Sequence, residues 1–462
     1  MSQISQESQK LPEERFDALI IGAGIAGIEA AIDMGDMGFK VLLVEKQPTI
    51  GGKVLLLSKV FPTLDCASCI SGTKTSAVSH HPNITLFTYS TVNEIIREET
   101  QNKPTIFRAN ITERPRYVNT SVCTSCGHCE EACPIIVPRE NDFGLRGRKA
   151  AYIPFDTAVP KKAVIDIDNC ILCMQCERIC PADAINFLQV PKEHSIVVDS
   201  IILAVGFSLF EADKKKEYHY GEYPNVVTGM QMDRIVAPTR PFNAVVRPSD
   251  GKEPQNIGYA LCTGSRDKTM GNPRCSQVCC MYSMKQAQLL MGSLPTADLT
   301  LYYMDIRAYG KGFDEFYNQC KEMGVKFVRG KVARVEQGEN SDLTVYHEDT
   351  QGSGTLQKTT HDMMVLSVGL LPNPAIASAF KNAKLELDEV GWIKLVSENS
   401  SSAQTSIEGV FTAGCASGPK DIPDSVLEAG AAASLCSSYI LKNRISEASK
   451  IPMTITVQRG TK

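Results

Sequence analysis

Two runs of four cysteines, each closed by a proline, constrain this chain more than any other feature of its sequence. The runs are Cys123-x2-Cys126-x2-Cys129-x3-Cys133-Pro134 and Cys170-x2-Cys173-x2-Cys176-x3-Cys180-Pro181. This spacing is typical of a loop that wraps a cubane iron–sulfur cluster. A structural zinc site would not need a third cysteine in register and a fourth before proline, twice over. The runs therefore predict a ferredoxin-like module that carries electrons.

The two runs also predict which cysteines share a cluster. In paired runs of this kind the fourth cysteine ligates the other cluster. One predicted set is Cys123, Cys126, Cys129 and Cys180, and the other is Cys170, Cys173, Cys176 and Cys133.

Composition narrows the class of protein. A chain of 462 residues predicts two or three domains, and its 17 cysteines, found beside nucleotide-binding glycines, indicate metal ligands rather than disulfides. The net charge of -4 and the lack of a basic run argue against a nucleic-acid partner. No apolar stretch approaches the ~18–20 residues of a membrane span, and the N-terminus carries no apolar signal core. We expect a cytoplasmic protein whose residues 1–15 form a flexible tail.

A dinucleotide-binding βαβ unit is predicted near the N-terminus. Its strand, glycine turn, helix and second strand cover Ala18–Ile21, Gly22-x-Gly24-x2-Gly27, Ile28–Met37 and Lys40–Val44. Glu45 ends the second strand, where a carboxylate binds the adenosine ribose, and the glycines let a pyrophosphate approach the helix N-terminus. None of the seven histidines lies in a recognisable catalytic string, which favours FAD over NAD as the nucleotide.

A second α/β unit begins at Asn256 and departs from a nucleotide-binding pattern. After the strand Ile257–Leu261, a pyridine-nucleotide-dependent reductase would have a glycine-rich phosphate turn. The sequence instead has four cysteines close together, at Cys262, Cys275, Cys279 and Cys280. We predict that they hold a third [4Fe–4S] cluster and that direct NAD(P)H oxidation is lost here. The alternative is that some of them are small buried hydrophobes.

Four further strings resemble one family of flavoproteins. They are Phe61–Cys66 (FPTLDC), Cys275–Tyr282 (CSQVCCMY), Asp305–Gly312 (DIRAYGKG) and Gly418–Pro423 (GPKDIP). With the ferredoxin-like insert and the two dinucleotide-type units, they make the chain similar to the A subunit of heterodisulfide reductase over nearly its whole length. The resemblance implies an α/β, thioredoxin-reductase-like fold with two dinucleotide domains and an inserted bacterial-type two-cluster ferredoxin. It also implies a shortened form, without the N-terminal cluster domain and the C-terminal ferredoxin of the archaeal subunits.

The expected domain boundaries follow from this order of units. Residues 1–15 form the tail, 16–116, 193–240 and 356–462 the FAD-binding domain, 117–192 the ferredoxin insert, and 241–355 the second domain with its cysteine cluster. The linker between the two cysteine runs is longer than a minimal ferredoxin needs, so residues 141–160 are expected to form a surface loop.

The resemblance assigns residues around an FAD. The pyrophosphate and adenosine end is assigned to Gly22, Gly24, Gly27, Glu45, Lys46, Gly51 and Gly52. The ribityl and isoalloxazine end is assigned to Gly414, Cys415, Asp421 and Ile422. Cys415 stands where many related flavoproteins have an aspartate. Lys420 is the candidate catalytic residue, because a cation near the flavin N1–C2 region stabilises the anionic reduced form, and the alternative is a solvated surface lysine.

The pair Cys66-x2-Cys69 has three open interpretations. It ligates a fourth cluster with residues of another domain or chain, it is a redox-active dithiol near the flavin, or it is an inherited pair without metal. The first interpretation is slightly preferred. Cys320 and Cys436 fall in helical patterns and are expected to be packing residues.

These expectations combine into one predicted function and two rivals. The chain is predicted to be an FAD and iron–sulfur electron-transfer subunit of a multi-subunit cytoplasmic oxidoreductase, whose flavin is a candidate for electron bifurcation. In the resembled family a partner subunit reduces the heterodisulfide. The expected partners are therefore other subunits, ferredoxin, an NADH- or hydrogen-linked module, a membrane subunit or a second copy of the chain. The rivals are a self-contained NAD(P)H-dependent reductase of the glutamate synthase small-subunit type and a relay subunit of a membrane-associated, quinone-linked or benzoyl-CoA-reducing-type assembly.

Overall fold

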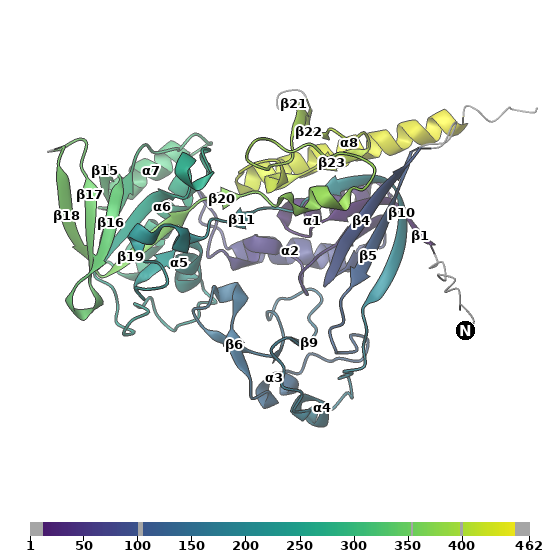
Figure 1. Ribbon diagram of the computed structural model, residues 1–462, viewed down its shortest axis with the longest axis horizontal. Coiled ribbons are helices and arrows are strands. Elements are labelled where there is room, and N and C mark those ends of the chain that lie inside the picture. The colour runs from purple at the N-terminus through teal and green to yellow at the C-terminus, as the bar shows by residue number, and fades with distance from the viewer. Residues whose placement is uncertain (1–12, 100–104, 353, 398–400, 449–462) are drawn as a thin grey trace, which may run out of the picture.

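Three modules make up the part of the chain that the structure describes (Figure 1). The computed structural model describes residues 13–99, 105–352, 354–397 and 401–448. Two modules are built on mainly parallel sheets and lie side by side. The ferredoxin-like insert lies below them in the figure, with α3 (His128–Ala132) and α4 (Gln175–Ile179) at its tip.

The first module is a nine-stranded sheet. Its main path runs β21–β22–β23–β10–β1–β2–β3, and the hairpin β4–β5 joins it through β10. The strands are β1 (Glu13–Ile21), β2 (Val41–Val44), β3 (Ile84–Phe87), β4 (Ser90–Glu98), β5 (Ile106–Glu113), β10 (Lys192–Leu203), β21 (Leu395–Ser397), β22 (Ser401–Thr405) and β23 (Val410–Thr412). β1 pairs in parallel with β2 and β10, and β10 with β23, so their carboxyl ends meet at one edge of the sheet.

Side chains alternate between the two faces of this sheet. In β1, Ala18 and Ile20 enter one apolar layer and Leu19 and Ile21 the other, as the two-residue repeat of a strand requires. Each face of the sheet is therefore buried.

Helices close the first layer. They are α1 (Ile25–Asp36), α2 (Ala67–His80) and the long α8 (Ile422–Ala448). The β4–β5 hairpin and the segment 374–393, which includes the 3₁₀ helix η7 (Pro374–Ala379), close the other layer. Within the described residues, none of the helices has the length and apolar character needed to cross a membrane.

The second module is a five-stranded, wholly parallel sheet in the order β12–β19–β13–β14–β15. Its strands are β12 (Val226–Thr228), β13 (Asn256–Thr263), β14 (Asp298–Tyr303), β15 (Lys326–Arg329) and β19 (Met363–Val368). One face packs against α5 (Gly229–Val236), α6 (Cys279–Ser293) and α7 (Phe313–Glu322). The other packs against the antiparallel sheet β16 (Val332–Gln337), β17 (Leu343–Glu348) and β18 (Leu356–His361).

The boundaries of the second module differ from those expected from the sequence. The ranges 193–240 and 356–462 were assigned to the FAD-binding domain, yet β12, α5, β18 and β19 belong to the second module. β19 pairs with β13 (Met363 opposite Ile257) and β12 with β19 (Val226 opposite Met364). The expectation was wrong because an apolar strand shows its burial in the sequence but not its partner. Two chain segments connect the first module to the second. They lie side by side, because β11 (Ser208–Leu209) in one pairs with β20 (Leu370–Leu371) in the other.

The insert is built from short hairpins around its cysteines. β6 (Ile136–Pro138) pairs with β7 (Gly147–Lys149), and β8 (Ala151–Tyr152) pairs with β9 (Val164–Ile165). Its small core consists of cluster-forming cysteines and apolar side chains such as Val118.

Two further expectations need correction. β1 begins at Glu13, so 13–15 belong to the sheet, and the remainder of the expected tail lies outside the described residues. The stretch 141–160 is not a free surface loop. Asp142 is 1% exposed, and Val159 exchanges backbone hydrogen bonds with the FAD-binding domain, donating to Thr49 Oγ1 (2.9 Å) and accepting from Ile50 N–H (3.0 Å).

The three modules meet at two neighbouring charged residues of α5. The carboxylate of Asp233 accepts from Ser58 N–H of the FAD-binding domain (3.0 Å) and pairs with Lys285 Nζ of α6 (2.5 Å). The next residue, Arg234, pairs with Asp142 of the insert (Nε to Oδ1, 2.9 Å). All four charged side chains are at least 93% buried. Buried pairs of this kind orient packed elements because breaking one leaves an uncompensated charge.

Replacing one member of this junction should loosen the whole structure. We expect Lys285→Met to lower the free energy of unfolding by ~3–5 kcal/mol, because Asp233 would keep its charge in a buried site. Thermal denaturation of the cofactor-loaded protein measures this. Lys326→Met, which breaks an exposed pair with Asp298, is the control and should cost at most ~1 kcal/mol. Equal shifts in the two variants would contradict the role of the junction.

Candidate functional site

The glycine turn after β1 allows close backbone approach. Gly22 has a φ of +102°, and a Cβ atom there would lie 2.3 Å from the carbonyl oxygen of Ala204. A Cβ at Gly27 would lie 1.9 Å from the carbonyl oxygen of Gly22. Both positions exclude any side chain, which is the packing reason for glycine in this βα turn.

The middle glycine of the turn faces open space. A Cβ at Gly24 would meet nothing within 4 Å. Gly24 is the N-cap of α1, and no side chain caps the first turn of the helix. Its N–H groups and the positive end of the helix dipole suit an anion. The donors of this turn therefore fit the pyrophosphate of a dinucleotide.

Glu45 lies across from the turn at the end of β2. Its carboxylate accepts from the backbone N–H groups of Ala23 and Gln47, each at 2.8 Å. Burial raises the pKa of Glu45, and these N–H groups act in the opposite direction. The carboxylate is thereby held at the strand end where a ribose hydroxyl is bound in dinucleotide folds. Lys46 is exposed beside it, and its backbone oxygen accepts from Arg114 (2.6 Å).

Gly51 and Gly52 pack directly against the glycine turn. Their φ angles are +116° and +58°, which favours glycine at both positions. Gly51 N–H donates to the carbonyl oxygen of Ala23 (2.8 Å), and a Cβ at Gly52 would lie 2.9 Å from Gly24 Cα. The structure thus brings the second glycine pair to the first.

The C-terminal part of the chain completes the same site. A Cβ at Gly414, whose φ is +64°, would lie 2.7 Å from the Cβ of Ala26 in α1. The Cys415 thiol donates to the carbonyl oxygen of Lys420 (3.4 Å), and burial raises its pKa.

The start of α8 lies beside the same glycine turn. Asp421 caps the helix by accepting from Asp424 N–H (2.8 Å), and burial raises the pKa of Asp421. Ile422 packs with Ile25 and Val54 in one apolar cluster. Residues from both ends of the sequence are thus brought together around the glycine turn.

The charge of Lys420, the candidate catalytic residue, is compensated by neighbouring residues of the C-terminal segment. Its Nζ donates to Ser417 Oγ (2.7 Å) and to the Gly414 carbonyl oxygen (3.3 Å), and it pairs with Glu428 (3.4 Å). The Glu428 side chain is only 6% exposed. A buried carboxylate therefore compensates the Lys420 charge.

Lys53 is a second cation at this site, and the sequence reasoning missed it. Its Nζ donates to the carbonyl oxygen of Phe207 (2.6 Å) and lies 4.7 Å from the centre of the Phe207 ring. Burial lowers the pKa of Lys53, while the charges of Cys415 and Glu45 raise it. No carboxylate of the described chain forms an ion pair with it. The available signal was its position directly after Gly51-Gly52.

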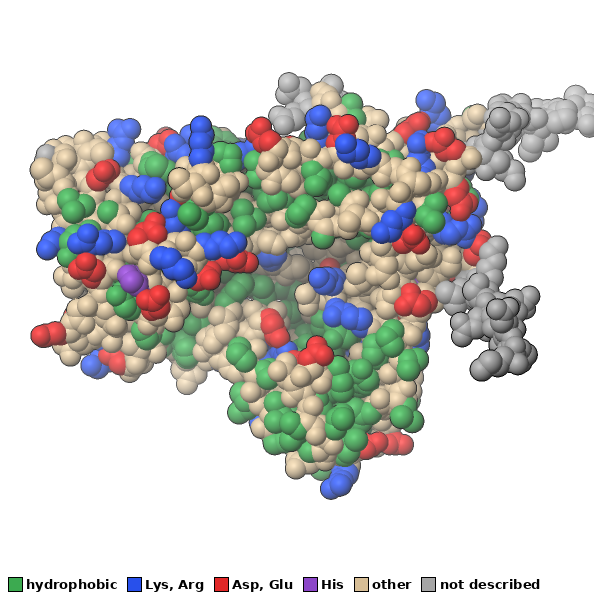
Figure 2. Space-filling model, viewed as in Figure 1, with side chains coloured by type: hydrophobic (Ala, Val, Ile, Leu, Met, Phe, Trp, Pro, Cys, Tyr) green, Lys and Arg blue, Asp and Glu red, His purple; other side chains and the backbone are tan. Residues whose placement is uncertain are grey.

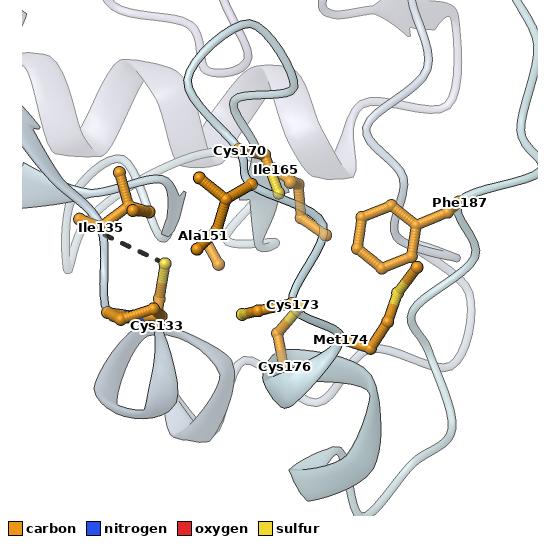
Figure 3. Close-up of a pocket in the computed structure, with 11 residues that line it drawn as sticks. Cys133, Ile135, Ala151, Ile165, Cys170, Cys173, Met174, Cys176 and Phe187 are labelled. Carbon is orange, nitrogen blue, oxygen red and sulfur yellow. Dashed lines mark hydrogen bonds between the residues drawn. The ribbon is translucent and has the colours of Figure 1, made fainter.

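The two cysteine runs of the insert form two cavities in the predicted combination. One is lined by Cys123, Cys126, Cys129 and Cys180. The other is lined by Cys133, Cys170, Cys173 and Cys176, whose side chains surround a common space in Figure 3. In the described residues no group of three or more possible ligands converges as a single-ion site. Thiols that line a cavity fit a cubane, which is a four-cornered body.

Crowded thiols alone are electrostatically unfavourable here. Burial raises the pKa of Cys129 to about 12, and the neighbouring thiolates of Cys123, Cys126 and Cys176 contribute. Burial raises the pKa of Cys176 to about 11 in the same way. Iron would stabilise the thiolates that this environment otherwise disfavours.

A third quartet lies in the second module. Cys279 and Cys280 begin α6 and are buried, Cys262 lies near the end of β13, and Cys275 lies in the loop between. Burial raises the pKa of Cys279 well above the usual value, and the thiolates of Cys262, Cys280 and Cys275 add to the shift. Four thiols therefore share one neighbourhood.

The turn at Cys275 repeats the turns of the insert. The residue two positions after Cys170 and Cys275 has a positive φ (Leu172 +54°, Gln277 +60°). In both turns its N–H donates to the cysteine sulfur at 3.3 Å. Ser125, two positions after Cys123, has a φ of +62°. Such N–H groups stabilise a thiolate and tune an iron–sulfur cluster.

The phosphate turn of a pyridine-nucleotide site is not formed in the second module. Gly264 follows β13 with a φ of +68°, but a Cβ there would lie 2.1 Å from the ring of Phe210. Gly264 is therefore closely packed, as Gly22 is after β1, but against an aromatic ring instead of backbone. α6 begins only at Cys279, so its N-terminus does not directly follow the strand.

The remaining cysteines separate into two kinds. Cys320 and Cys436 are fully buried within the apolar cores, where their thiols donate to Met284 O (3.8 Å) and Ser200 Oγ (3.1 Å). Cys66 and Cys69 lie at the N-terminus of α2, outside all three quartets.

Comparison with known proteins agrees with these modules. Residues 17–65 match the model of FAD dependent oxidoreductases, residues 122–185 that of 4Fe-4S dicluster domains, and residues 301–433 that of pyridine nucleotide-disulphide oxidoreductases. Thioredoxin reductase of T. acidophilum has the same fold, with a TM-score of 0.51 and 15% identity over 92% of this chain and 99% of that one.

Much closer relatives are found among archaeal proteins. One is the A subunit of the H(2):CoB-CoM heterodisulfide,ferredoxin reductase of Methanothermobacter marburgensis, which is 43% identical over 430 residues, covering 93% of this chain and 64% of that protein. Another is the iron-sulfur A subunit of the CoB--CoM heterodisulfide reductase of Methanocaldococcus jannaschii, which is 44% identical over 432 residues, covering 93% and 65%.

Fold and site together define an oxidoreductase subunit with FAD-binding and [4Fe–4S] dicluster domains on a thioredoxin-reductase-like framework. Within that class, the chain is a homologue of heterodisulfide reductase A subunits over 93% of its own length. It spans slightly less than two thirds of the length of the curated relatives that it matches.

Lys53 should tune the flavin more strongly than Lys420. Removing an unpaired cation disfavours the anionic reduced flavin, so we expect Lys53→Met to lower the two-electron midpoint potential by about 30 mV or more, which is ~1.4 kcal/mol. Lys420→Met is the matched control and should shift the potential less, because Glu428 already balances its charge. Potentiometric titration of both variants measures this, and a larger shift in the Lys420 variant would reverse the assignment.

Proposed function

We propose that this chain is an electron-transfer subunit that passes electrons between an FAD and three [4Fe–4S] clusters, in a complex with other subunits. The observation that carries the proposal is that one chain combines a dinucleotide-type glycine turn with three groups of four thiols, two of which line cavities in the insert. An FAD supplies two-electron chemistry with one-electron release, and the clusters carry single electrons. The chain's own residues hold these groups and set their charges.

The surface of the insert supports the expected partners. Apolar side chains gather on its visible face in Figure 2, and Ile171 lines one of the two cysteine cavities. The exposed ones are Val122, Ile136, Ile171, Leu172, Ile179, Leu188 and Val190. Leu188 is 88% exposed, and an apolar patch of this kind is typical of a surface that binds another protein. We therefore place the contact with a partner subunit, or with a ferredoxin, on the insert.

Electron bifurcation is the stronger form of this proposal. Two separate cysteine-bearing modules adjoin one flavin domain, which provides the two routes that bifurcation requires. The relative from Methanococcus maripaludis is the A subunit of an H(2)/formate:CoB-CoM heterodisulfide,ferredoxin reductase, a name that joins two acceptors. It is 43% identical over 429 residues, covering 92% of this chain and 64% of that protein. If electrons leave the flavin by two paths, removing the third quartet should leave the insert as the one remaining path.

The third cluster can be tested by iron content. We expect the Cys279→Ala/Cys280→Ala variant to lose the iron of one cubane, about four atoms per chain, while the clusters of the insert remain reducible. The control is Cys320→Ala/Cys436→Ala, which also removes two buried thiols but should keep its iron. Iron analysis and electron paramagnetic resonance of the reduced proteins give the result. Equal iron in both variants would contradict the third cluster.

The rival NAD(P)H-dependent reductase makes the opposite prediction for a dye assay. Because α6 begins only at Cys279 and places no helix N-terminus directly after β13, we expect the isolated holoprotein to reduce a dye with NADPH or NADH far below ~1 s⁻¹, the lower end of ordinary turnover. The same preparation should reduce the dye after photoreduction of its flavin, which shows that it is competent. Ordinary turnover with either nucleotide would favour the rival.

A further inference from the structure

Cys66 and Cys69 form a site that the cluster quartets do not use. Cys66 is the N-cap of α2, and Cys69 lies in the first turn of the helix. Cys69 is exposed and Cys66 is partly exposed, whereas the cysteines that begin α6 are buried. Two cysteines three positions apart at a helix start are spaced to form a disulfide with each other, and the helix end favours a thiolate.

The scaffold beneath the pair is rigid. Residues 59–66 form a tight turn. The backbones of Lys59 and Cys66 form an antiparallel β-bridge, and Val60 N–H donates to the Asp65 carbonyl oxygen (3.0 Å). Ala67 is fully buried in an apolar cluster with Ile25, at the glycine turn, and Ile422, at the start of α8. The pair is therefore fixed on the wall of the dinucleotide site on one side and open to solvent on the other.

The two thiols act on each other and not on a further cysteine. The hydrogen bond from Cys69 lowers the pKa of Cys66, with smaller effects from backbone N–H groups and Lys59, while the same contact raises the pKa of Cys69. By contrast, three other cysteines raise the pKa of Cys129 in the insert, and three raise that of Cys279 in the second module. Within the described residues this site is a pair, with one thiol suited to attack and the other to resolve.

We infer that Cys66 and Cys69 are a redox-active dithiol that reduces a solvent-accessible disulfide by thiol–disulfide exchange. This activity is separate from the cluster and flavin electron transfer proposed above, because it needs only the two thiols.

The exchange balances without another reagent. The Cys66 thiolate attacks one sulfur of the incoming disulfide, which forms a mixed disulfide and releases the first product thiolate. The Cys69 thiol then loses its proton and attacks the Cys66 sulfur, which forms the Cys66–Cys69 disulfide and releases the second product thiolate. The dithiol gives up two electrons and two protons, and the substrate disulfide becomes two thiols.

A single tryptic peptide reports on the pair. Residues 60–74 lie between Lys59 and Lys74 and contain Cys66 and Cys69 but no other cysteine. The anaerobic holoprotein would be incubated with glutathione disulfide, quenched in acid and alkylated before digestion. We expect the doubly alkylated peptide to fall at least ~10-fold, and an unalkylated form lighter than the dithiol by two hydrogen atoms to replace it.

Two variants make the result decisive. Cys69→Ser should trap glutathione on Cys66, because the resolving thiol is gone. Cys66→Ser/Cys69→Ser should keep the iron content of the wild type, and serine is a favoured N-cap, so the fold should survive. A peptide that stays doubly alkylated would overturn the inference. So would a loss of iron in the double variant, which would make the pair ligands of a further cluster and leave the three-cluster proposal intact.

Discussion

The buried charges at α5 are the contact on which the arrangement of the modules depends. Asp233 joins the FAD-binding domain to α6, and the adjacent Arg234 joins the insert through Asp142. Electron transfer between cofactors needs fixed distances, and modules joined only by chain crossings would not provide them. A buried ion pair is orientation-specific, because any displacement leaves a charge without its partner in a medium that solvates it poorly.

The second module shows how one fold changes its task by small substitutions. The strand and the helix of a nucleotide-binding unit remain, but the phosphate turn between them is not formed, Phe210 packs on Gly264, and cysteines begin α6. The turn at Cys275 has the same backbone conformation and the same N–H to sulfur contact as the turn at Cys170. Backbone N–H groups stabilise the negative charge of a phosphate in one kind of loop, and here Gln277 N–H does the same for the Cys275 sulfur.

Sequence reasoning succeeded where the information is local. The glycine turn, Glu45 and the cysteine spacings report backbone geometry that only certain residues permit, and the structure places these residues together. Sequence reasoning failed where the outcome depends on which distant strand or side chain a residue contacts. β19 was assigned to the first module, residues 141–160 were expected to form a surface loop, and Lys53 was overlooked. Lys420 was chosen as the candidate cation because Glu428, its partner in α8, cannot be recognised as such before the fold is known.

The two cysteine runs, by themselves, determined that the insert carries two thiol quartets and how the quartets are shared, because ligand spacing is a property of the chain. Tertiary structure decided what surrounds them. It placed the third quartet in one neighbourhood, left Cys66 and Cys69 as an isolated pair beside the dinucleotide site, and fixed the insert to α5. Burial and charge pairing join residues far apart in sequence, so these contacts exist only once the modules have packed.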